Sequence, residues 1–347
     1  MSAKTLKHDL PAAPPKIRLA QVPTPLRLLS RTSKALGCRI WLKADDLTGS
    51  VLSGNKVRKL EYLLAEAQQQ ADLVITCGGL QSNHCRATAL ACAQIGMECV
   101  LLLRGDSNSV SEIENVGNML LDNLSGADIR VVPRSRYVSN LDALFAELES
   151  ECVQRGRRAY CIPTGGSNDL GVWGYLDASR ELAADVAREN FQPDAIVCAT
   201  GSGGTLAGLA LGSALFGLSA RVLGFAVCDS EKYFLDKVGR DLNRWATRFN
   251  SGSLPSINMA VNDRYIGPGY AKIYPEVADC IAHIAREEGL VLDPVYTGKA
   301  FYGMLNEIKN GCLNGMSDIV FVHTGGSFGL FPFADAFANR ASSSIGR

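Results

Sequence analysis

Short apolar runs alternate with longer amphipathic stretches along most of this chain. The short runs are rich in β-branched residues, whereas the longer ones repeat apolar residues at the spacing of a helix face. The predicted strands are residues 39–44, 73–77, 99–103, 128–132, 159–162, 195–199, 221–227 and 319–323. The predicted helices are residues 56–70, 84–95, 109–124, 141–155, 180–189, 271–288 and 299–309, with another long helix after residue 205. This alternation predicts parallel sheets with helices on both faces.

Glycine-rich loops follow several of the predicted strands. They comprise residues 78–83, 163–168 and 200–205. In an open parallel sheet, ligands bind outside the carboxyl ends of the strands. We therefore expect these loops to line one binding site.

The composition is that of an ordinary globular protein. The chain has 347 residues, of which 47% are hydrophobic and 20% charged, with 35 basic and 35 acidic residues. This length is enough for about two domains. Zero net charge gives no electrostatic reason to expect nucleic acid or an anionic membrane surface as a partner. The longest run of low charge, residues 206–220, is too short and too rich in Gly and Ser to cross a bilayer.

Eleven cysteines are scattered through apolar segments without a Cys-x-x-Cys pair. Cys85, Cys92 and Cys99 recur every seven residues, but a structural zinc site needs closer pairs, so we interpret them as core residues and predict no metal. Unpaired cysteines are typical of a reducing compartment. We expect a cytoplasmic protein, and residues 1–15 leave an unusual organellar targeting segment open.

Lys56 stands at the predicted N-terminus of a helix, after Gly54 and Asn55. The helix dipole and the nearby charges of Arg58 and Lys59 disfavour its ammonium form and so lower its pKa. A lysine with a lowered pKa is suited to forming an imine. Cations at a helix start also suit a phosphate site, and a solvated basic turn is the third interpretation.

The loop at residues 200–205, Thr-Gly-Ser-Gly-Gly-Thr, joins an apolar strand to a long helix. Glycines let the backbone N–H groups approach an anion, which predicts a phosphate site. No Gly-Lys-Ser/Thr follows, so this is not a Walker A loop. The loop also lacks the G-x-G-x-x-G spacing, although Asp229 follows the next strand where a ribose-binding acid is expected. A nicotinamide dehydrogenase and a purely structural strand–helix joint therefore stay open.

Ser82, Asn83 and His84 lie in sequence at a second junction between a strand and a helix. Ser and Asn are common helix N-caps, so capping is their default role. Side by side, the three also form a set of hydrogen-bonding groups for a carboxylate. Tyr270 and Tyr296 lie in loops near glycines, where each alone carries little functional information.

Taken together, these segments resemble the fold-type-II, tryptophan-synthase-β-like pyridoxal-phosphate enzymes, and within them the family of D-cysteine desulfhydrase and 1-aminocyclopropane-1-carboxylate deaminase. The similarity covers nearly the whole chain. It implies an α/β fold of two open, twisted, mainly parallel sheets flanked by helices. The larger, cofactor-binding domain is then residues 1–52 and 164–347, and the smaller inserted domain is residues 53–163. It also implies a homodimer that acts on a small amino acid.

The resemblance assigns roles to residues in the matching motifs. Lys56 is expected to form an imine with pyridoxal 5′-phosphate and to act in catalysis with Ser82, Tyr270 and Tyr296. The residues expected to hold the cofactor are Lys56, Lys59, Asn83, Gly201, Ser202, Gly203, Gly204, Thr205 and Thr324. The residues expected to bind the substrate are Ser82, Asn83, His84 and Thr297.

Thr297 and Thr324 decide the substrate within this family. Its deaminases have an acidic residue at the first position and leucine at the second, whereas hydroxyls at both follow the desulfhydrase pattern. A carboxylate beside the pyridine nitrogen keeps that nitrogen protonated, while a threonine hydroxyl only hydrogen-bonds it. A thiolate leaves readily once the Cα proton is lost, so the weaker electron sink suffices and the hydroxyls favour elimination of sulfide.

The resemblance therefore implies a lyase that converts D-cysteine to pyruvate, ammonia and hydrogen sulfide through aldimine and aminoacrylate intermediates. The base at Cα is left open among Lys56, Tyr270 and Tyr296. The alternatives are 1-aminocyclopropane-1-carboxylate deaminase or elimination from another β-substituted amino acid. Outside this class, a nicotinamide-dependent dehydrogenase and a non-catalytic amino-acid-binding protein stay open.

Overall fold

The computed structural model describes residues 10–106, 113–250 and 252–338. Its strands are β1 (Leu26–Leu28), β2 (Arg39–Lys43), β3 (Leu73–Gly79), β4 (Glu98–Gly105), β5 (Asp128–Pro133), β6 (Ala159–Ile162), β7 (Ala195–Thr200), β8 (Arg221–Ala226), β9 (Met259–Asn262) and β10 (Asp318–Val322). Its α-helices are α1 (Ser30–Leu36), α2 (Asn55–Gln70), α3 (Asn83–Gln94), α4 (Asn118–Leu124), α5 (Arg134–Gln154), α6 (Val172–Arg188), α7 (Gly204–Leu215), α8 (Glu231–Arg248), α9 (Pro275–Glu288) and α10 (Thr297–Lys309).

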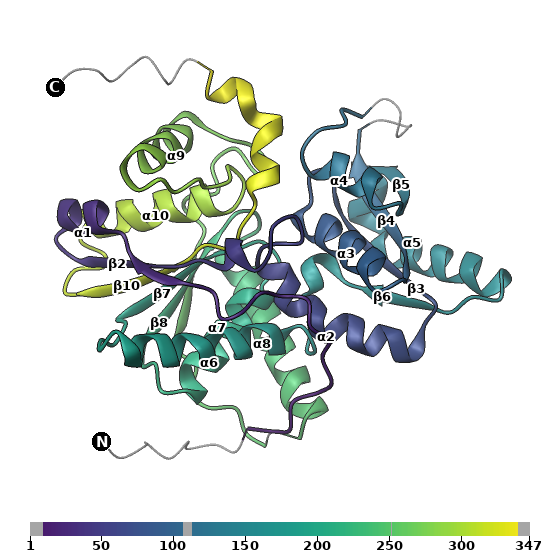
Figure 1. Ribbon diagram of the computed structural model, residues 1–347, viewed down its shortest axis with the longest axis horizontal. Helices are drawn as coiled ribbons and strands as arrows, with labels where there is room; N and C mark the ends of the chain where they lie inside the picture. The colour runs from purple at the N-terminus through teal and green to yellow at the C-terminus, as the bar shows by residue number, and fades with distance from the viewer. Residues whose placement is uncertain (1–9, 107–112, 251, 339–347) are drawn as a thin grey trace.

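The strands form two separate open sheets with helices around them (Figure 1). The six-stranded sheet has the order β1-β2-β10-β7-β8-β9, and the four-stranded sheet has the order β5-β4-β3-β6. Among the described strands, all neighbours pair in parallel except β1 and β2. The predicted fold class is confirmed. The smaller sheet is built within residues 53–163, and the domain boundaries themselves stay a prediction.

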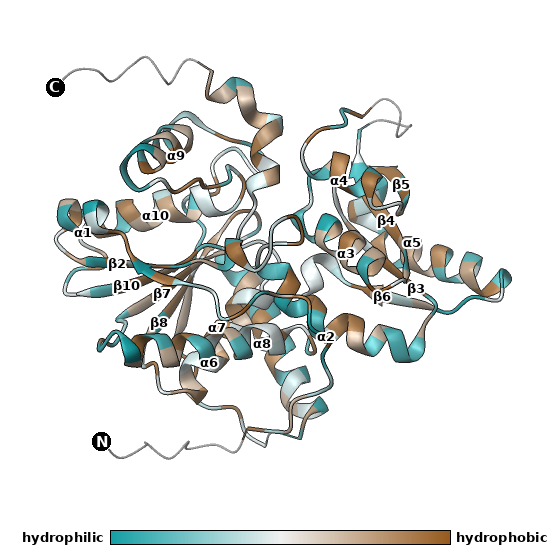
Figure 2. Cartoon of the chain, in the orientation of Figure 1, coloured by the Kyte–Doolittle hydropathy of each residue, from teal (hydrophilic) through white to brown (hydrophobic). Residues whose placement is uncertain are grey.

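The central strands of the larger sheet are buried on both faces. Every residue of β7 and β10 is buried, because helices cover both sides of a parallel sheet. In Figure 2 these strands are mainly brown, which marks apolar residues. The continuous apolar runs 195–199 and 319–323 therefore predicted these strands correctly.

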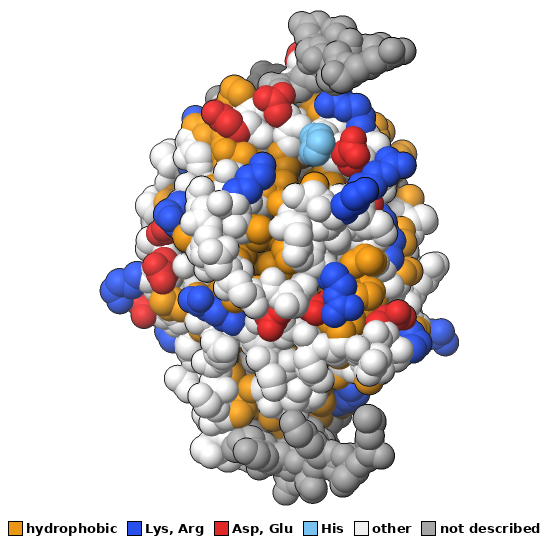
Figure 3. Space-filling view, turned by 90° about the vertical axis from the view of Figure 1, so that its left-hand side faces the viewer, with side chains coloured by type: hydrophobic (Ala, Val, Ile, Leu, Met, Phe, Trp, Pro, Cys, Tyr) orange, Lys and Arg blue, Asp and Glu red, His pale blue; other side chains and the backbone are white. Residues whose placement is uncertain are grey.

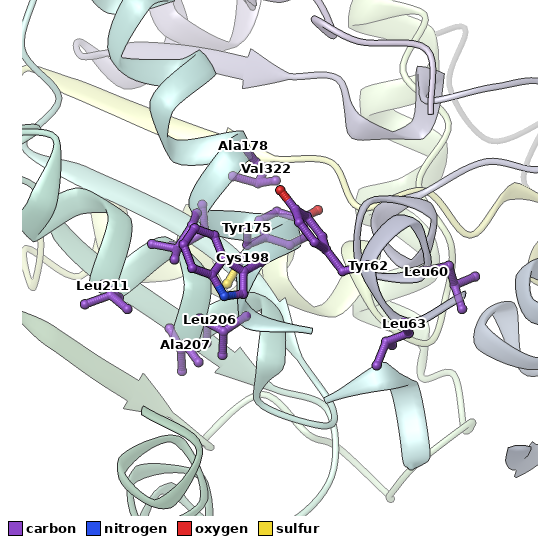
Figure 4. Packing of buried hydrophobic residues seen from close by; sticks show 14 of the residues in the cluster. Leu60, Tyr62, Leu63, Tyr175, Ala178, Cys198, Leu206, Ala207, Leu211 and Val322 are labelled. Carbon is purple, nitrogen blue, oxygen red and sulfur yellow. The ribbon is translucent and has the colours of Figure 1, made fainter. Parts of the chain in front are cut away.

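Helices α6 and α7 pack unusually closely beside this sheet. A Cβ atom on Gly208 or Gly212 of α7 would lie only 2.3 Å from a side-chain atom of Tyr175 or Ser179 in α6. Glycine is therefore required for this approach. Figure 4 shows the core that results, in which Tyr175 lies near Cys198 of β7.

A buried cluster of charged groups anchors the first turn of α2 to the larger sheet. Arg58 of α2 donates two hydrogen bonds to Asp45, of 2.8 and 2.9 Å, and a third of 3.1 Å to Glu181 of α6. Lys43 at the end of β2 pairs with Glu181 and, at 2.6 Å, with Asp185. Burial alone would raise the pKa of Asp45, but Arg58 outweighs it and the pKa is lowered. Ionic contacts thus tie the start of α2 to β2, to the turn at Asp45 and to α6.

Several predicted helix bounds were wrong. The helix predicted over residues 141–155 begins at Arg134, because Asn140 with φ −136° interrupts a longer helix and breaks its periodicity. The helix predicted over residues 180–189 begins at Val172, and that predicted over 271–288 begins at Pro275. Of the helix predicted over 109–124, only Asn118–Leu124 is helical, and residues 109–112 lie outside the described part. The elements β1, α1, α8 and β9 were not predicted.

The surface and the cysteines agree with the composition. Basic and acidic side chains are interspersed on the face shown in Figure 3. No helix within the described residues has both the length and the apolar character needed to cross a membrane.

All eleven cysteines are free, and Cys85, Cys92 and Cys99 lie in the core. The described residues contain no group of three or more His, Cys, Asp or Glu placed to hold a metal ion.

Candidate active site

A cavity of about 880 Å³ lies where the two sheets face each other. Its wall includes Arg104 at the end of β4 and the loops that follow β3, β6, β7, β8 and β10. The carboxyl ends of strands from both sheets therefore meet at one site, as the loop positions predicted. This volume is in the usual range for a cofactor or substrate site.

Most of the predicted site residues line this cavity. They are Lys56, Ser82, Asn83, His84, Gly201, Ser202, Gly203, Thr205, Tyr270, Tyr296 and Thr324. Lys59 and Gly204 are not in its wall but lie directly behind it, and Thr297 is also not in its wall.

Lys56 is at the start of α2 and its Nζ is 3.3 Å from the carbonyl oxygen of Gly165. Burial lowers its pKa to about 8, and Cys85 acts weakly in the opposite direction. The predicted direction is confirmed, but burial is the main cause rather than the helix dipole and the neighbouring cations. A large fraction of such an amine is neutral near pH 8 and able to act as a nucleophile or base.

Two further lysines lie close to Lys56. Lys59 Nζ is 3.3 Å from the oxygen of Gly165 and 3.2 Å from Ser167 Oγ. Burial lowers the pKa of Lys59 strongly, and the charges of Lys56 and Lys237 lower it further. In the described part of the chain, these three lysines have one ion-pair partner, the Asp241 carboxylate beside Lys237. The amino groups of the three lysines converge on Gly165 and Ser167, an arrangement that suits the binding of an anion.

The loop at residues 200–205 supplies the rest of an anion site. Gly203 has φ +84°, a left-handed conformation that favours glycine, and it is the N-cap of α7. A Cβ atom on Gly204 would be 2.6 Å from Ser167 Oγ and 2.9 Å from Lys59 Nζ, so a side chain would block the approach. Ser202 Oγ lies 2.8 Å from Ser167 Oγ. Free N–H groups at a helix start, hydroxyls and lysines together fit a phosphate group.

The segment from Ser82 to His84 begins α3. Ser82 Oγ accepts a hydrogen bond from the N–H of Cys85 and so caps this helix, at 3.2 Å. Asn118 Nδ2 donates to Asn83 Oδ1 at 2.9 Å. The amide NH₂ group of Asn83 is thereby left for a ligand.

His84 is neutral and presents an acceptor. Burial lowers its pKa well below the usual value, and Lys56 and Lys59 lower it further. Thr76 Oγ1 donates to the oxygen of Ile162 at 2.9 Å, so it accepts the proton of His84 Nε2 at 2.8 Å. The unprotonated Nδ1 has no partner in the described part of the chain. The predicted contact of His84 with a substrate carboxylate therefore depends on its main-chain N–H and not on its ring.

Tyr270 and Tyr296 form a hydrogen-bonded pair with their hydroxyl oxygens 2.5 Å apart. Burial raises the pKa of both phenols. Either hydroxyl can be the donor of this hydrogen bond.

The two threonines expected to set the substrate have different surroundings. Thr324, after β10, lines the cavity. Thr297 begins α10, is fully buried and donates from Oγ1 to Asp293 Oδ1 at 2.7 Å. Asp293 also accepts from the N–H groups of Val295, Tyr296 and Thr297. The Thr297 hydroxyl thus belongs to a helix-capping arrangement, and of the two threonines only Thr324 lines the cavity.

The sequence prediction missed four residues of this site. Ser167, Lys237, Arg104 and Asn118 all contact its wall or line it. Ser167 lies in a glycine-rich loop, and Arg104 is next to the last residue of a strand, so the rule on carboxyl ends could have found both. Lys237 and Asn118 lie within helices, and no local pattern in the sequence separates them from surface residues.

Comparisons with known proteins agree with this geometry. Residues 17–325 match the family model described as pyridoxal-phosphate dependent enzyme. The chain is 42% identical over 342 residues to a bifunctional D-cysteine desulfhydrase/1-aminocyclopropane-1-carboxylate deaminase, mitochondrial, of Arabidopsis thaliana, covering 96% of this chain and 83% of the relative. It is 38% identical over 332 residues to a D-cysteine desulfhydrase of Yersinia pseudotuberculosis, covering 95% and 98%.

A putative 1-aminocyclopropane-1-carboxylate deaminase of Thermotoga maritima is 43% identical over 321 residues, covering 91% of this chain and 97% of the relative. A solved structure titled as an ACC deaminase homologue superposes with a TM-score of 0.82 at 37% identity, covering 93% of this chain and 95% of that one. A fungal L-serine ammonia-lyase from Rhizomucor miehei shares the fold, with a TM-score of 0.66 at 18% identity over 93% and 99% of the chains.

The residues of the cavity fit the cofactor that this match implies. A neutral lysine amine at the wall, a glycine loop at a helix start and buried lysines that lack enough carboxylate partners fit the aldehyde and the phosphate of pyridoxal phosphate. A nicotinamide-binding fold is excluded by the family match. The predicted resemblance is confirmed, and the chain belongs to the pyridoxal-phosphate-dependent enzymes of fold type II, in the group that contains D-cysteine desulfhydrases and 1-aminocyclopropane-1-carboxylate deaminases.

Proposed function

We propose that this enzyme is a carbon–sulfur lyase that converts D-cysteine and water to pyruvate, ammonia and hydrogen sulfide. The observation that carries the proposal is the hydroxyl of Thr324 in the cavity wall, where the family's deaminases have leucine. The names of the relatives from Arabidopsis and Yersinia support the same reaction class. Thr297 supports it less than we expected, because its hydroxyl is bonded to Asp293.

The cofactor would be held at both ends by residues on the cavity wall. Lys56 would bind it covalently through Nζ, and the N–H groups of residues 201–205 with Lys59 would hold its phosphate. The NH₂ group of Asn83 and the hydroxyl of Thr324 would hydrogen-bond its ring substituents. When bound, pyridoxal phosphate supplies an electron sink for the pair released at Cα of an amino acid.

The substrate carboxylate would bind at the start of α3. Ser82 and the free N–H groups of this helix start lie in the cavity wall, and helix N-termini favour negative charge. Asn118 fixes the amide of Asn83, so the donor group of Asn83 does not rotate away. The carboxylate is thereby held between donors whose orientation is set before the substrate arrives.

Two proton transfers are needed, and we assign them to Lys56 and to the Tyr270–Tyr296 pair. Lys56 Nζ, whose pKa is lowered to about 8, would take the proton from Cα. The hydrogen-bonded phenols of Tyr270 and Tyr296 would move a proton to the departing sulfur. If the variant Tyr270→Phe were to lose proton exchange at Cα while Lys56 stays functional, these two roles would be reversed.

The decisive experiment measures steady-state rates of the purified enzyme with three substrates. D-cysteine should give pyruvate at a rate well above that of L-cysteine, and 1-aminocyclopropane-1-carboxylate should give little 2-oxobutanoate. A dominant 2-oxobutanoate rate would establish the deaminase instead, which the names of the Thermotoga relative and of the solved structure favour. Cofactor colour without turnover of any amino acid would indicate a binding protein.

We also propose a homodimer in a reducing compartment, as for a cytoplasmic enzyme. Leu47, Val51 and Phe331 are 53%, 39% and 58% exposed. Gly325, at the start of the segment that leads to Phe331, lies close to Asp46, since a Cβ atom on Gly325 would be 3.6 Å from Asp46 Cα. Apolar side chains exposed together suit a subunit contact. Light scattering should give twice the chain mass, and Phe331→Asp should lower it.

A further inference from the structure

Arg104 brings a third region of positive charge into the cavity. It lies next to the end of β4, opposite Gly79 in the parallel pairing with β3, and it lines the same cavity as Lys56. The lysines of the phosphate site are Lys56, Lys59 and Lys237, and the expected carboxylate site is at the start of α3. Neither site uses Arg104.

Two aromatic rings hold the guanidinium of Arg104 in place. Its Cζ lies 4.8 Å from the ring centre of Tyr270 and 5.6 Å from that of Tyr137 in α5. Stacking of this kind orients an arginine and leaves its N–H groups free to bind an anion. Asp142 and Asp229 also line the cavity, but in the described part of the chain no carboxylate forms an ion pair with Arg104.

Arg104 lies near the place that the side chain of a bound amino acid would occupy. A Cβ atom on Gly79 would be 3.7 Å from Arg104 Nε and 3.9 Å from Tyr270 Cε1, so the three residues meet at one point. The N–H of Ser82 donates to the oxygen of Gly79 at 3.0 Å, which places the carboxylate site one turn away. A substrate bound by its carboxylate at Ser82 can therefore direct its β-substituent to Arg104.

We propose that Arg104 is a specificity-determining residue that binds the negative charge of the substrate's β-substituent. This inference rests on the proposed elimination reaction. In that reaction the Cα–H and Cβ–S bonds break: Lys56 takes the Cα proton, the C–H electron pair becomes the Cα=Cβ bond, and sulfur keeps the Cβ–S pair, leaves as hydrosulfide and then takes a proton from the Tyr270–Tyr296 pair. Arg104 stabilises the charge that develops on sulfur. The preferred substrate class is β-substituted D-amino acids whose substituent is, or leaves as, an anion, including the sulfonate D-cysteate.

The test compares the holoenzyme with Arg104→Gln and Arg104→Lys. Arg130→Gln is the matched control, because Arg130 lies in β5 of the same sheet, pairs with Asp128 on the surface and does not line the cavity. Binding of D-cysteate and of D-alanine, which has no β-substituent charge, is followed by titration of the cofactor absorbance. Turnover of D-cysteine is measured in parallel.

The wild type should bind D-cysteate more tightly than D-alanine. Arg104→Gln should weaken D-cysteate binding about 10- to 100-fold and D-alanine binding less than about threefold, as expected for loss of one charged hydrogen-bonding partner. Arg104→Lys should fall between wild type and Arg104→Gln, and Arg130→Gln should match wild type.

Equal losses for both ligands would overturn the proposal, because Arg104 would then bind the α-carboxylate or merely support Tyr270. Unchanged D-cysteate binding in Arg104→Gln would overturn it as well. If the wild type fails to turn over D-cysteine but still shows the selective loss of D-cysteate binding, the proposed lyase activity is wrong while the anion site stands.

Discussion

At the residue scale, burial decides the chemistry of Lys56. Its position after a Gly-Asn turn is readable from the sequence, and the direction of its pKa shift was predicted correctly. The main cause lies outside the local motif, because the loops after β3, β6 and β7 line the same cavity as the amine and shield it from much of the solvent. Which distant loops cover a lysine cannot be read from its neighbours in the chain.

This burial predicts a pH dependence for cofactor attachment. The neutral amine reacts, and its fraction grows as the proton is lost, so the rate rises with pH. For a pKa of about 8, the rate at which cofactor-free protein forms its imine with pyridoxal phosphate should rise until that pH and then level off. A solvent-exposed lysine would continue to about pH 10.4. Stopped-flow absorbance measures this rate, with Lys56→Ala as the variant that should form no imine. A rate that rises without a break to pH 10 would disprove the lowered pKa.

A second residue-scale prediction concerns Asn118, which orients the amide of Asn83. In Asn118→Ala, Asn83 loses that hydrogen bond and its NH₂ group no longer has one orientation. The cofactor absorbance spectrum should change, and kcat/KM for D-cysteine should fall about tenfold, as for loss of one positioning hydrogen bond. Asn123→Ala, an exposed change on the same helix, should leave both unchanged. An unaltered spectrum in Asn118→Ala would remove the positioning role.

At the element scale, periodicity found most helices but not their ends. Helix α8 was missed although Phe234, Val238, Leu242 and Trp245 form one buried face. Charged residues separate the apolar ones there, and this polar composition suggested a loop. The spacing of the apolar residues nevertheless indicates a helix. The kink at Asn140 had the opposite effect in α5, since a real helix there lost its regular pattern. The buried charges of α2 gave no sequence signal, because Arg58 and Glu61 look like surface residues.

These buried charges predict a large stability effect at Arg58. Arg58→Met leaves the fully buried Asp45 without the partner of its ion pair, while Glu181 keeps Lys43, and breaking such a buried pair costs about 3–5 kcal/mol. Arg180→Met, an exposed change in α6, should cost less than about 1 kcal/mol. Urea unfolding measures both.

The same cluster predicts sensitivity to acid. The pKa of Asp45 is lowered in the folded protein, so its contribution is present above the unfolded value of about 3.9 and is lost as pH falls through the folded value. Arg58→Met should therefore remove part of the acid-dependent loss of stability. Equal unfolding free energies for Arg58→Met and Arg180→Met would show that the cluster does not anchor α2.

At the scale of the whole molecule, the site exists only because two sheets face each other. The fold class and most of the site residues could be predicted, since glycine-rich loops mark the carboxyl ends of strands. Whether a given side chain points into the cavity or packs behind its wall could not be predicted from the sequence. Thr297 and Thr324 look equivalent in sequence, yet one caps α10 through Asp293 and the other lines the cavity.

This difference leads to the last prediction, on the choice of substrate. Thr324→Leu removes a hydroxyl from the cavity wall, where we propose that it bonds the cofactor, and it narrows the cavity, so kcat/KM for D-cysteine should fall at least about tenfold with little change in unfolding free energy. Thr297→Val leaves the cavity wall in place but breaks the bonds to Asp293, so its main effect should be a loss of about 1–3 kcal/mol in stability. Kinetics with D-cysteine and urea unfolding of both variants separate the two roles.

Should Thr297→Val reduce turnover more than Thr324→Leu while the fold stays stable, Thr297 would contact the bound cofactor after a local rearrangement, and the weight placed on Thr324 would be misplaced. Gain of activity on 1-aminocyclopropane-1-carboxylate is not required of Thr324→Leu, because positioning a new ring within about 1 Å depends on the whole wall of the cavity.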